Sequence, residues 1–231
     1  MGKLSKRQKA SKGLLESEKR YGLGEALALL KKTAAPKFDE SVDMAIRLGV
    51  DPRKADQMIR GSCQLPHGTG KSVRVLVVAK GEKLAEAEEA GADHYGGEEL
   101  IEKIKGGWLE FDRMVATPDM MAQVGKVGKI LGPRGLMPNP KVGTVTNDIK
   151  QVVSTIKAGQ VEFRVDKTGI LHVPVGRMSF DSKKLEENVM TLVETVKRMR
   201  PGSAKGTYMK SLTINSTMGP GVPLDPASFI S

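Results

Sequence analysis

The chain has 231 residues, 39% of them hydrophobic, which is enough for one large domain or two of ordinary size. Its formal net charge of +10 favours a polyanionic partner, either nucleic acid or an anionic membrane surface. No apolar run approaches the roughly 20 residues of a transmembrane helix. The basic amino-terminal arm, which includes Lys3, Lys6, Arg7, Lys9 and Lys12, has too few large apolar residues for a membrane-surface helix. Nucleic acid is therefore the better partner, with no membrane involved.

Cysteine and histidine usage excludes a disulfide framework and a zinc site. Cys63 is the single cysteine, which fits a reducing cytoplasm, and the three histidines lie far apart in sequence. We therefore expect a cytoplasmic protein with no metal and no cofactor.

The first flanking piece of the chain, residues 1–67, contains one clear helix and one clear strand. The segment 24–34 has the composition of a helix. The segment 41–50 alternates apolar and other residues with the period of a strand that is buried on one face.

The middle piece, residues 68–159, alternates between strand and helix patterns. Strands are predicted at 74–79 and 113–118. Helices are predicted at 83–92, 98–107, 119–131 and 147–159. Strands that alternate with helices indicate a parallel, Rossmann-like sheet.

The second flanking piece, residues 160–231, returns to antiparallel signals. The segment 161–176 predicts a hairpin whose turn is 166–169, because Asp and Gly suit such turns. An apolar stripe predicts a helix over 181–199 that Pro201 ends, and 207–217 alternates as a strand. Strands with helices on one face indicate an α+β sandwich.

Charge divides the chain in the same way. The two flanking pieces carry 24 Lys and Arg against 15 Asp and Glu, whereas the middle piece carries 13 against 12. We therefore predict a discontinuous α+β domain made of 1–67 and 160–231, with an inserted α/β domain at 68–159. The two crossings between them contain His67, Gly68, Gly70 and Gly159, which suit a hinge, although ordinary tight connections remain an alternative.

One stretch of the middle piece concentrates uncompensated positive charge. Lys126, Lys129, Arg134 and Lys141 lie between Asp119 and Asp148 with no acidic residue among them. The prolines and glycines of 129–141 indicate a stiff, shaped loop after a short helix. We predict a secondary contact with nucleic acid, or else a rigid contact between the two domains.

Enzyme motifs are weak throughout. The segment 68–72 resembles the end of a phosphate-binding loop, but Leu65 occupies the position where the motif requires glycine. The predicted strand also follows this segment, whereas a phosphate-binding loop follows its strand. The glycine spacing of a dinucleotide fingerprint is missing after 74–79. The alternative function is a nucleotide-dependent enzyme on the middle piece, which tight binding of a small nucleotide would favour.

Aromatic residues make up only 4% of the chain, which favours recognition of a folded RNA over stacking of single-stranded bases. Phe38 and Met218 are candidates for RNA contact, with core packing as the alternative. Thr217 is expected to offer its hydroxyl to RNA at a strand end. A side chain at Gly219 is expected to obstruct RNA while barely touching the core.

From about residue 21 to residue 223 the chain resembles the bacterial type of the ribosomal protein L-one family. The motifs that carry the resemblance are VGKILGPRGLMPNPKVG (127–143), KFDESVD (37–43), DPRKADQMIRG (51–61), LPHGTGK (65–71), AKGEK (79–83), GAD (91–93), VATPD (115–119), VEFRVDKTGILHVPVG (161–176), AKGTY (204–208) and STMGP (216–220). The resemblance implies a non-catalytic protein of the large ribosomal subunit, present as a monomer at the tip of a mobile stalk. It also implies two domains, an RNA-binding one made from both chain ends and an inserted Rossmann-like one.

The implied partners are large-subunit rRNA, exit-site tRNA, whose release the stalk assists, and the protein's own mRNA, whose translation many family members repress. The rRNA contacts that the resemblance implies are Lys37, Phe38, Ser41, Arg164, Asp166, Lys167, Thr168, Gly169, His172, Ser211, Thr217, Met218 and Gly219.

Overall fold

The structure is a computed structural model that describes residues 9, 13–16, 19–33 and 36–229. Most of the basic amino-terminal arm, including Lys3, Lys6, Arg7 and Lys12, lies outside the described residues. Contacts divide the chain into two compact units. Unit 1 combines residues 1–70 and 161–231, and unit 2 is residues 71–160. The domains predicted from the sequence have their borders at 67/68 and 159/160, and those borders stay a prediction.

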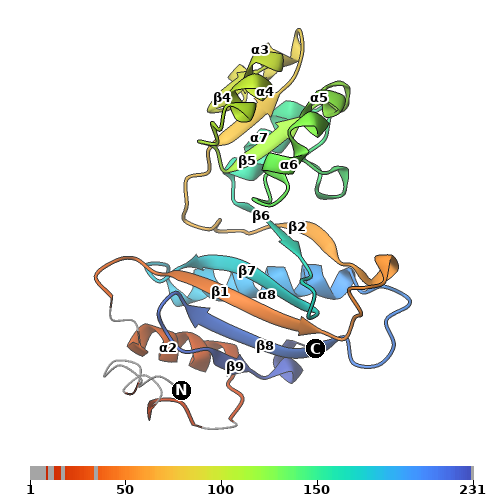
Figure 1. Ribbon diagram of the computed structural model, residues 1–231. Helices are drawn as coiled ribbons and strands as arrows, with labels where there is room; N and C mark the ends of the chain where they lie inside the picture. Colours follow the sequence, from red (N-terminus) through yellow and green to blue (C-terminus); the bar gives the residue numbers. More distant parts are fainter. Residues whose placement is uncertain (1–8, 10–12, 17–18, 34–35, 230–231) are drawn as a thin grey trace. The chain divides into compact units, whose positions relative to one another are not determined.

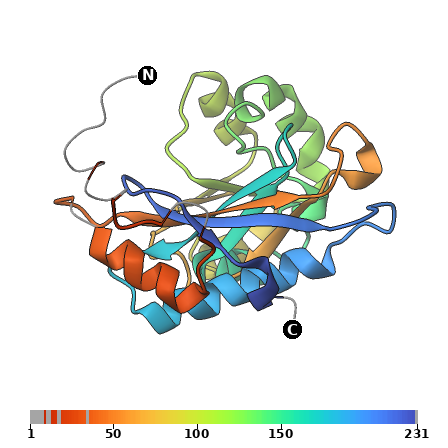
Figure 2. The same cartoon turned by 90° about the horizontal axis from the view of Figure 1, so that it is seen from below.

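Unit 1 is built on an antiparallel sheet of four strands in the order β7-β1-β8-β9 (Figure 1). The strands are β1 (Ser41–Leu48), β7 (Ile170–Arg177), β8 (Met209–Ser216) and β9 (Val222–Leu224). Two helices, α2 (Leu23–Thr33) and α8 (Ser182–Arg198), lie on one side of this sheet, as Figure 2 shows. A 3-10 turn, Pro226–Phe229, follows β9.

The sequence period explains which face of this sheet packs against α2 and α8. In β1, Val42, Met44, Ile46 and Leu48 are buried and join the core of unit 1, while the residues between them are half-buried or exposed. The predicted apolar stripe of α8 is buried in the same core. The expected helix and strand of the first flank and the helix and strand of the second are confirmed, with ends that shift by one or two residues.

The predicted hairpin at 161–176 is wrong. Strand β6 (Gln160–Arg164) pairs with β2 (Arg60–Gln64) in a separate sheet of two strands, whereas β7 pairs with β1. The turn at 166–169 does form, and Asp166 N donates to Ile170 O at 2.9 Å, but it directs the chain from one sheet into another. Strand β2, with the sequence RGSCQ, has too little apolar alternation to be recognised as the true partner of β6.

Unit 2 contains a parallel sheet of three strands in the order β4-β3-β5. The strands are β3 (Val75–Val78), β4 (His94–Gly96) and β5 (Arg113–Ala116), and the helices are α3 (Lys83–Glu89), α4 (Glu98–Lys105), α5 (Met121–Lys126), α6 (Gly128–Leu131) and α7 (Ile149–Lys157). Alternate residues of β3 belong to two different buried clusters. Both faces of the sheet are therefore covered, which is why β3 is apolar at every position.

The predicted single helix at 119–131 is also wrong in detail. A 3-10 turn (Pro118–Met120) leads into α5, and the helix is interrupted at Val127 before α6 begins. Gly125 and Gly128 flank the break, and glycine weakens a helix interior by roughly 1 kcal/mol relative to alanine. Strand β4 lies in a segment for which the sequence predicted no element.

Candidate nucleic-acid interface

The side of the unit 1 sheet opposite α2 and α8 presents alternate, mostly polar residues, which we term the open face. Its members are Ser41, Asp43, Ala45, Arg47, Ile170, His172, Pro174, Ser211, Thr213 and Asn215, all half-buried or exposed. Arg47 is exposed and lies between Ile170 and Ser211 in the register of the three strands. The side chain of His172 is 66% exposed. The open face therefore offers hydroxyls, an amide, a guanidinium and an imidazole to a partner.

At one end of β1, the turn Thr217–Gly219 is fastened to the residues that begin the strand. Thr217 Oγ1 accepts a hydrogen bond from Ser41 N at 3.1 Å and lies 3.3 Å from Ser41 O, to which it donates. Met218 N donates to Glu40 Oε1 at 2.8 Å. Glu40 is only 1% exposed, so a buried carboxylate holds the backbone of this turn in place. The sequence did not indicate this role for Glu40.

These contacts correct two expectations about the turn. The hydroxyl of Thr217 already has partners in the protein, so it is a strand-end contact as well as a candidate RNA contact. A Cβ added to Gly219 would lie 2.4 Å from Oγ of Ser216, which is fully buried. The expectation that a side chain at 219 would barely touch the core is therefore wrong. Gly219 N also donates to Ser216 O, and this hydrogen bond closes the turn tightly.

Phe38 and Met218 stand out as large apolar side chains in solvent. Phe38 is 55% exposed and Met218 is 52% exposed, so the alternative of core packing is wrong for both. Lys37, beside Phe38, is also exposed. The loop that carries Lys37 and Phe38 is fixed through Asp39. The carboxylate of Asp39 accepts hydrogen bonds from Ser179 N at 3.0 Å and Ser179 Oγ at 2.8 Å. A flat ring and a thioether are thus presented on anchored backbone.

At the other end of β1, the turn 166–169 is organised by the carboxylate of Asp166. Its Oδ1 accepts from Ile170 N and from Thr168 N, both at 2.8 Å, and from Thr168 Oγ1 at 2.7 Å. The Ile170 N–H, followed by the Thr168 hydroxyl, lowers the pKa of Asp166. Gly169 has a φ of 83° and its carbonyl accepts from Leu48 N at 2.8 Å, which ties the turn to the end of β1. Lys167 is exposed at the tip.

The two turns therefore lie at opposite ends of one strand. At roughly 3.3 Å per residue, the seven steps from Ser41 to Leu48 span about 23 Å. Between the two ends, the open face supplies His172, Arg47 and Ser211. The thirteen residues expected to contact rRNA thus fall on the three neighbouring strands β7, β1 and β8, on the end of β6 and on the adjacent loops of unit 1. Arg47 was missed, although it is the exposed polar position in the alternation of β1.

In unit 2, all four expected cations, Lys126, Lys129, Arg134 and Lys141, are exposed. Within the described part of the chain, none of them forms an ion pair with a carboxylate. The loop after α6 is internally bonded, as the sequence suggested: Asn139 Oδ1 accepts from Lys141 N and Asn139 N donates to Thr144 Oγ1, both at 2.8 Å.

The expected hinge residues differ in how tightly they are held. His67 N donates to Asn188 Oδ1 at 3.1 Å, and Asn188 Nδ2 donates to Gly68 O at 3.0 Å. His67 also contacts Glu187, and Asn188 itself is fully buried. Gly70 has a φ of 71° and is followed by residues 71–74 without helix or strand. Gly159, with a φ of 104°, follows Ala158, the C-cap residue of α7.

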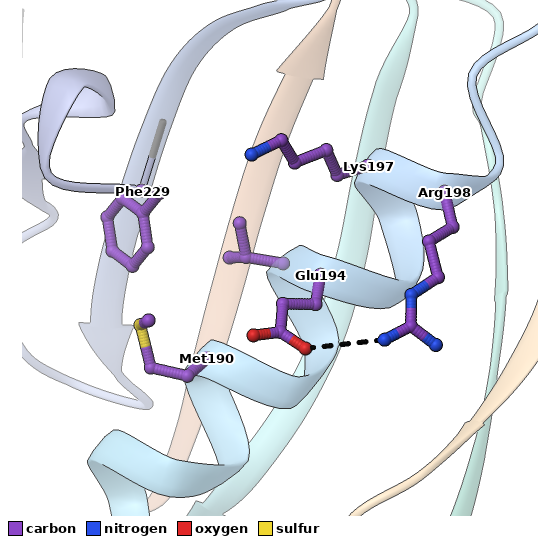
Figure 3. Close-up of a pocket in the computed structure, with 6 residues that line it drawn as sticks. Met190, Glu194, Lys197, Arg198 and Phe229 are labelled. Atoms are coloured by element: carbon purple, nitrogen blue, oxygen red, sulfur yellow. Dashed lines mark ion pairs between the residues drawn. The ribbon is translucent and has the colours of Figure 1, made fainter. Parts of the chain in front are cut away.

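Figure 3 shows a separate hollow of about 280 Å³ against α8. Met190 and Phe229 face each other across it, while Glu194 and Arg198 form an ion pair of 3.7 Å. Its charges are mixed, and α8 lies on the covered side of the sheet. This hollow therefore does not belong to the open face.

Neither a metal centre nor a membrane-spanning helix is found among the described residues. No three metal-ligating His, Cys, Asp or Glu side chains gather anywhere in the part of the chain that the structure describes. In that same part, no helix has the length and apolar character needed to cross a bilayer.

A sheet face that exposes a guanidinium, an imidazole and hydroxyls, flanked by anchored loops that expose Phe38 and Met218, is typical of a nucleic-acid-binding protein. A model of the Ribosomal protein L1p/L10e family matches residues 30–220. The Large ribosomal subunit protein uL1 of Syntrophobacter fumaroxidans is 57% identical over 226 residues, which cover 98% of this chain and 97% of that relative. The chain belongs to the ribosomal protein L1p/L10e family. It is accordingly an RNA-binding protein of translation and not an enzyme, and the alternative of a nucleotide-dependent enzyme is wrong.

Proposed function

We propose that unit 1 binds large-subunit rRNA at the mobile stalk of the ribosome. The relative from Syntrophobacter fumaroxidans is named as a large-subunit protein, and this chain is a large-subunit ribosomal protein by the same relationship. The observation that carries the proposal is the pair of solvent-facing turns, 166–169 and 217–219, at the two ends of β1. Both are held by hydrogen bonds within the protein, so their exposed groups are presented to RNA without a large cost of ordering.

Charge supports unit 1 as the main binder. The pieces that form unit 1 carry an excess of nine positive charges, and unit 2 carries an excess of one. Phosphate contacts from Lys37, Arg164 and Lys167 release counterions, so the affinity falls steeply with salt. Phe38 and Met218 contribute contact area to unstacked bases or ribose faces.

Unit 2 is proposed to be an inserted, Rossmann-like domain that moves relative to unit 1. Its parallel sheet with helices on both faces supports this description. The hinge falls after Gly70 and near Gly159, because His67 and Gly68 are bonded to Asn188 and move with unit 1. The cations of the loop after α6 make a secondary contact with nucleic acid. In this proposal the stalk protein is a monomer within the ribosome, and its movement assists release of deacylated tRNA from the exit site.

A second function is repression of the protein's own translation. It rests on the same surface, because an mRNA segment that presents the same folded shape and phosphates as the rRNA site binds the same groups. Competition between a leader segment of its mRNA and the rRNA fragment, at equal salt, tests the idea. Simultaneous binding of both RNAs to one protein molecule would exclude it.

The main proposal is tested by removing unit 2. A protein in which residue 70 is joined to residue 160 by a short glycine linker keeps β2, β6 and the Asn188 contacts. It is expected to fold, as checked by circular dichroism and urea unfolding, and to retain most of the affinity for a stalk rRNA fragment. Loss of specific binding by the folded protein would contradict the assignment of the main rRNA surface to unit 1.

A further inference from the structure

Beside the 166–169 turn, unit 1 contains a hollow that no motif predicted, which we term the arginine hollow. It is lined by Pro52, Arg53, Met58, Arg164 and Lys167 and has a volume of about 440 Å³. The first three residues belong to the loop that follows β1, and Arg164 ends β6. The volume lies within the range of small-ligand sites, roughly 300–1,000 Å³.

The hollow combines apolar walls with uncompensated positive charge. Met58 is 38% exposed, and Arg164 Nη2 lies 3.5 Å from its sulfur, so the guanidinium and the thioether are held together. In the described part of the chain, Arg53, Arg164 and Lys167 form no ion pair with a carboxylate.

Two carboxylates close in sequence to the cations of the hollow, those of Asp51 and Asp166, accept hydrogen bonds from the backbone. Asp51 Oδ1 accepts from Arg53 N at 3.1 Å, and Asp166 Oδ1 accepts from the N–H groups of its own turn. These acidic groups therefore shape the two loops and leave the cations of the hollow available to an anionic partner. The apolar walls and the positive charge of the hollow together suit a ligand that is flat, polarisable and attached to phosphate.

We propose that the arginine hollow binds one unstacked nucleobase of the structured rRNA. The inference rests on the proposed rRNA binding by unit 1 and adds Pro52, Arg53 and Met58 to that site. Guanidinium planes stack on bases, and a thioether makes favourable contacts with aromatic rings. Lys167 lies at the rim and supplies a point charge for the adjacent phosphate. Recognition of a displaced base also explains how a chain with few aromatic residues reads RNA at this position.

A base within RNA is favoured over a free nucleotide. The hollow is lined largely by exposed side chains, so a single mononucleotide gains little burial there. A base in RNA is held nearby by the phosphate contacts of the 166–169 turn and the open face, which raises its effective concentration.

The test uses the full chain and the fragment of large-subunit rRNA that the protein protects from nuclease. Abasic nucleotides are introduced one at a time into that fragment, and binding is measured for the wild type, Arg53→Lys and Met58→Ala. At one position the abasic change is expected to weaken wild-type binding about tenfold and to have little further effect on either variant. Such non-additivity identifies the base that occupies the hollow.

Salt dependence separates stacking from simple charge. Arg53→Lys keeps the charge and loses the plane, so its affinity is expected to fall about fivefold with an unchanged salt slope. Lys54→Ala removes an exposed cation from the same loop that does not line the hollow, and is the matched control. Its loss is expected to be smaller and to appear in the salt slope.

Three results would overturn the inference. Abasic effects that add to those of Arg53→Lys and Met58→Ala at every position would show that no base enters the hollow, while leaving rRNA binding intact. Micromolar binding of adenosine monophosphate that Arg53→Lys abolishes would assign the hollow to a free nucleotide instead. Failure of the wild type to protect any fragment of large-subunit rRNA from nuclease would remove the proposed function and the hollow with it.

Discussion

Replacing Thr217 with valine separates a binding role from a packing role at the strand end. The change keeps the size of the side chain and removes both hydrogen bonds to the backbone of Ser41. Each neutral hydrogen bond contributes roughly 0.5–1.5 kcal/mol, and water can reach this exposed site, so we expect the free energy of unfolding to fall by about 1 kcal/mol. If the hydroxyl or the turn that it fixes contacts RNA, the affinity is expected to fall about tenfold, or about 1.4 kcal/mol.

The two effects are separable because global unfolding barely changes the measured affinity. A protein with an unfolding free energy of about 5 kcal/mol that loses about 1 kcal/mol is still only about 0.1% unfolded. A tenfold loss of affinity therefore reports a local change at the interface. Urea unfolding and RNA binding at fixed salt provide the two measurements.

Thr191→Val is the matched control for this experiment. Thr191 lies on α8, on the covered side of the sheet, and its hydroxyl donates to Glu187 O at 2.8 Å. The same chemical change there is expected to leave RNA affinity unaltered. A Thr217→Val protein that loses stability but binds RNA as tightly as the wild type would refute our reasoning, and Thr217 would then serve only to join the strand ends.

Three further variants test other parts of the structure. The pKa of Asp166 is lowered in the folded protein, so its stabilising effect is present above the unfolded pKa of about 3.9. That effect is lost as the pH falls through the lower folded pKa. Urea unfolding curves of the wild type and Asp166→Asn should therefore differ at pH 6 and converge near pH 2. Asn188→Ala leaves its backbone partners without the buried amide, so we expect a loss of about 2–4 kcal/mol in unfolding free energy, and a loss below about 0.5 kcal/mol would contradict the anchoring role. Replacing Arg134 and Lys141 by alanine should weaken binding to the ribosome modestly and reduce the salt slope; an unchanged affinity and slope would leave only a structural role for the loop.

Most of the fold was predictable where one period dominates a segment. The alternation in β1 and the apolar stripe of α8 each specify a buried face, and both are confirmed. The hairpin prediction was wrong because strand pairing is a long-range choice: β6 pairs with β2, about 100 residues earlier, and RGSCQ carries little local signal. The prediction of one continuous helix at 119–131 was wrong because Gly125 and Gly128 outweigh the continuous apolar pattern.

The candidate site was predictable as a set of residues and only partly as geometry. Exposure of Phe38 and Met218 depends on which loop packs against the core, and composition alone favoured the opposite outcome. The buried carboxylate of Glu40 and the close approach of Gly219 to Ser216 are contacts between residues that no pattern links. The sequence therefore indicated which groups are expected to contact RNA, while the structure revealed what holds those groups in place.

In the proposed RNA site, these contacts would allow an exposed surface to be specific without many aromatic side chains. A free loop must be ordered when RNA binds, and ordering each residue costs roughly 1–2 kcal/mol of backbone entropy. In this protein Glu40 holds the 217–219 turn, and Asp166 holds its own turn through three hydrogen bonds. The carboxylates of Glu40 and Asp166 accept hydrogen bonds from backbone N–H groups and so order the loops, and in the described part of the chain neither forms an ion pair with a lysine or an arginine. In the proposed RNA site, negative residues are thus expected to contribute to affinity by pre-organising the loops, and their replacement should weaken binding even though it makes the surface more positive.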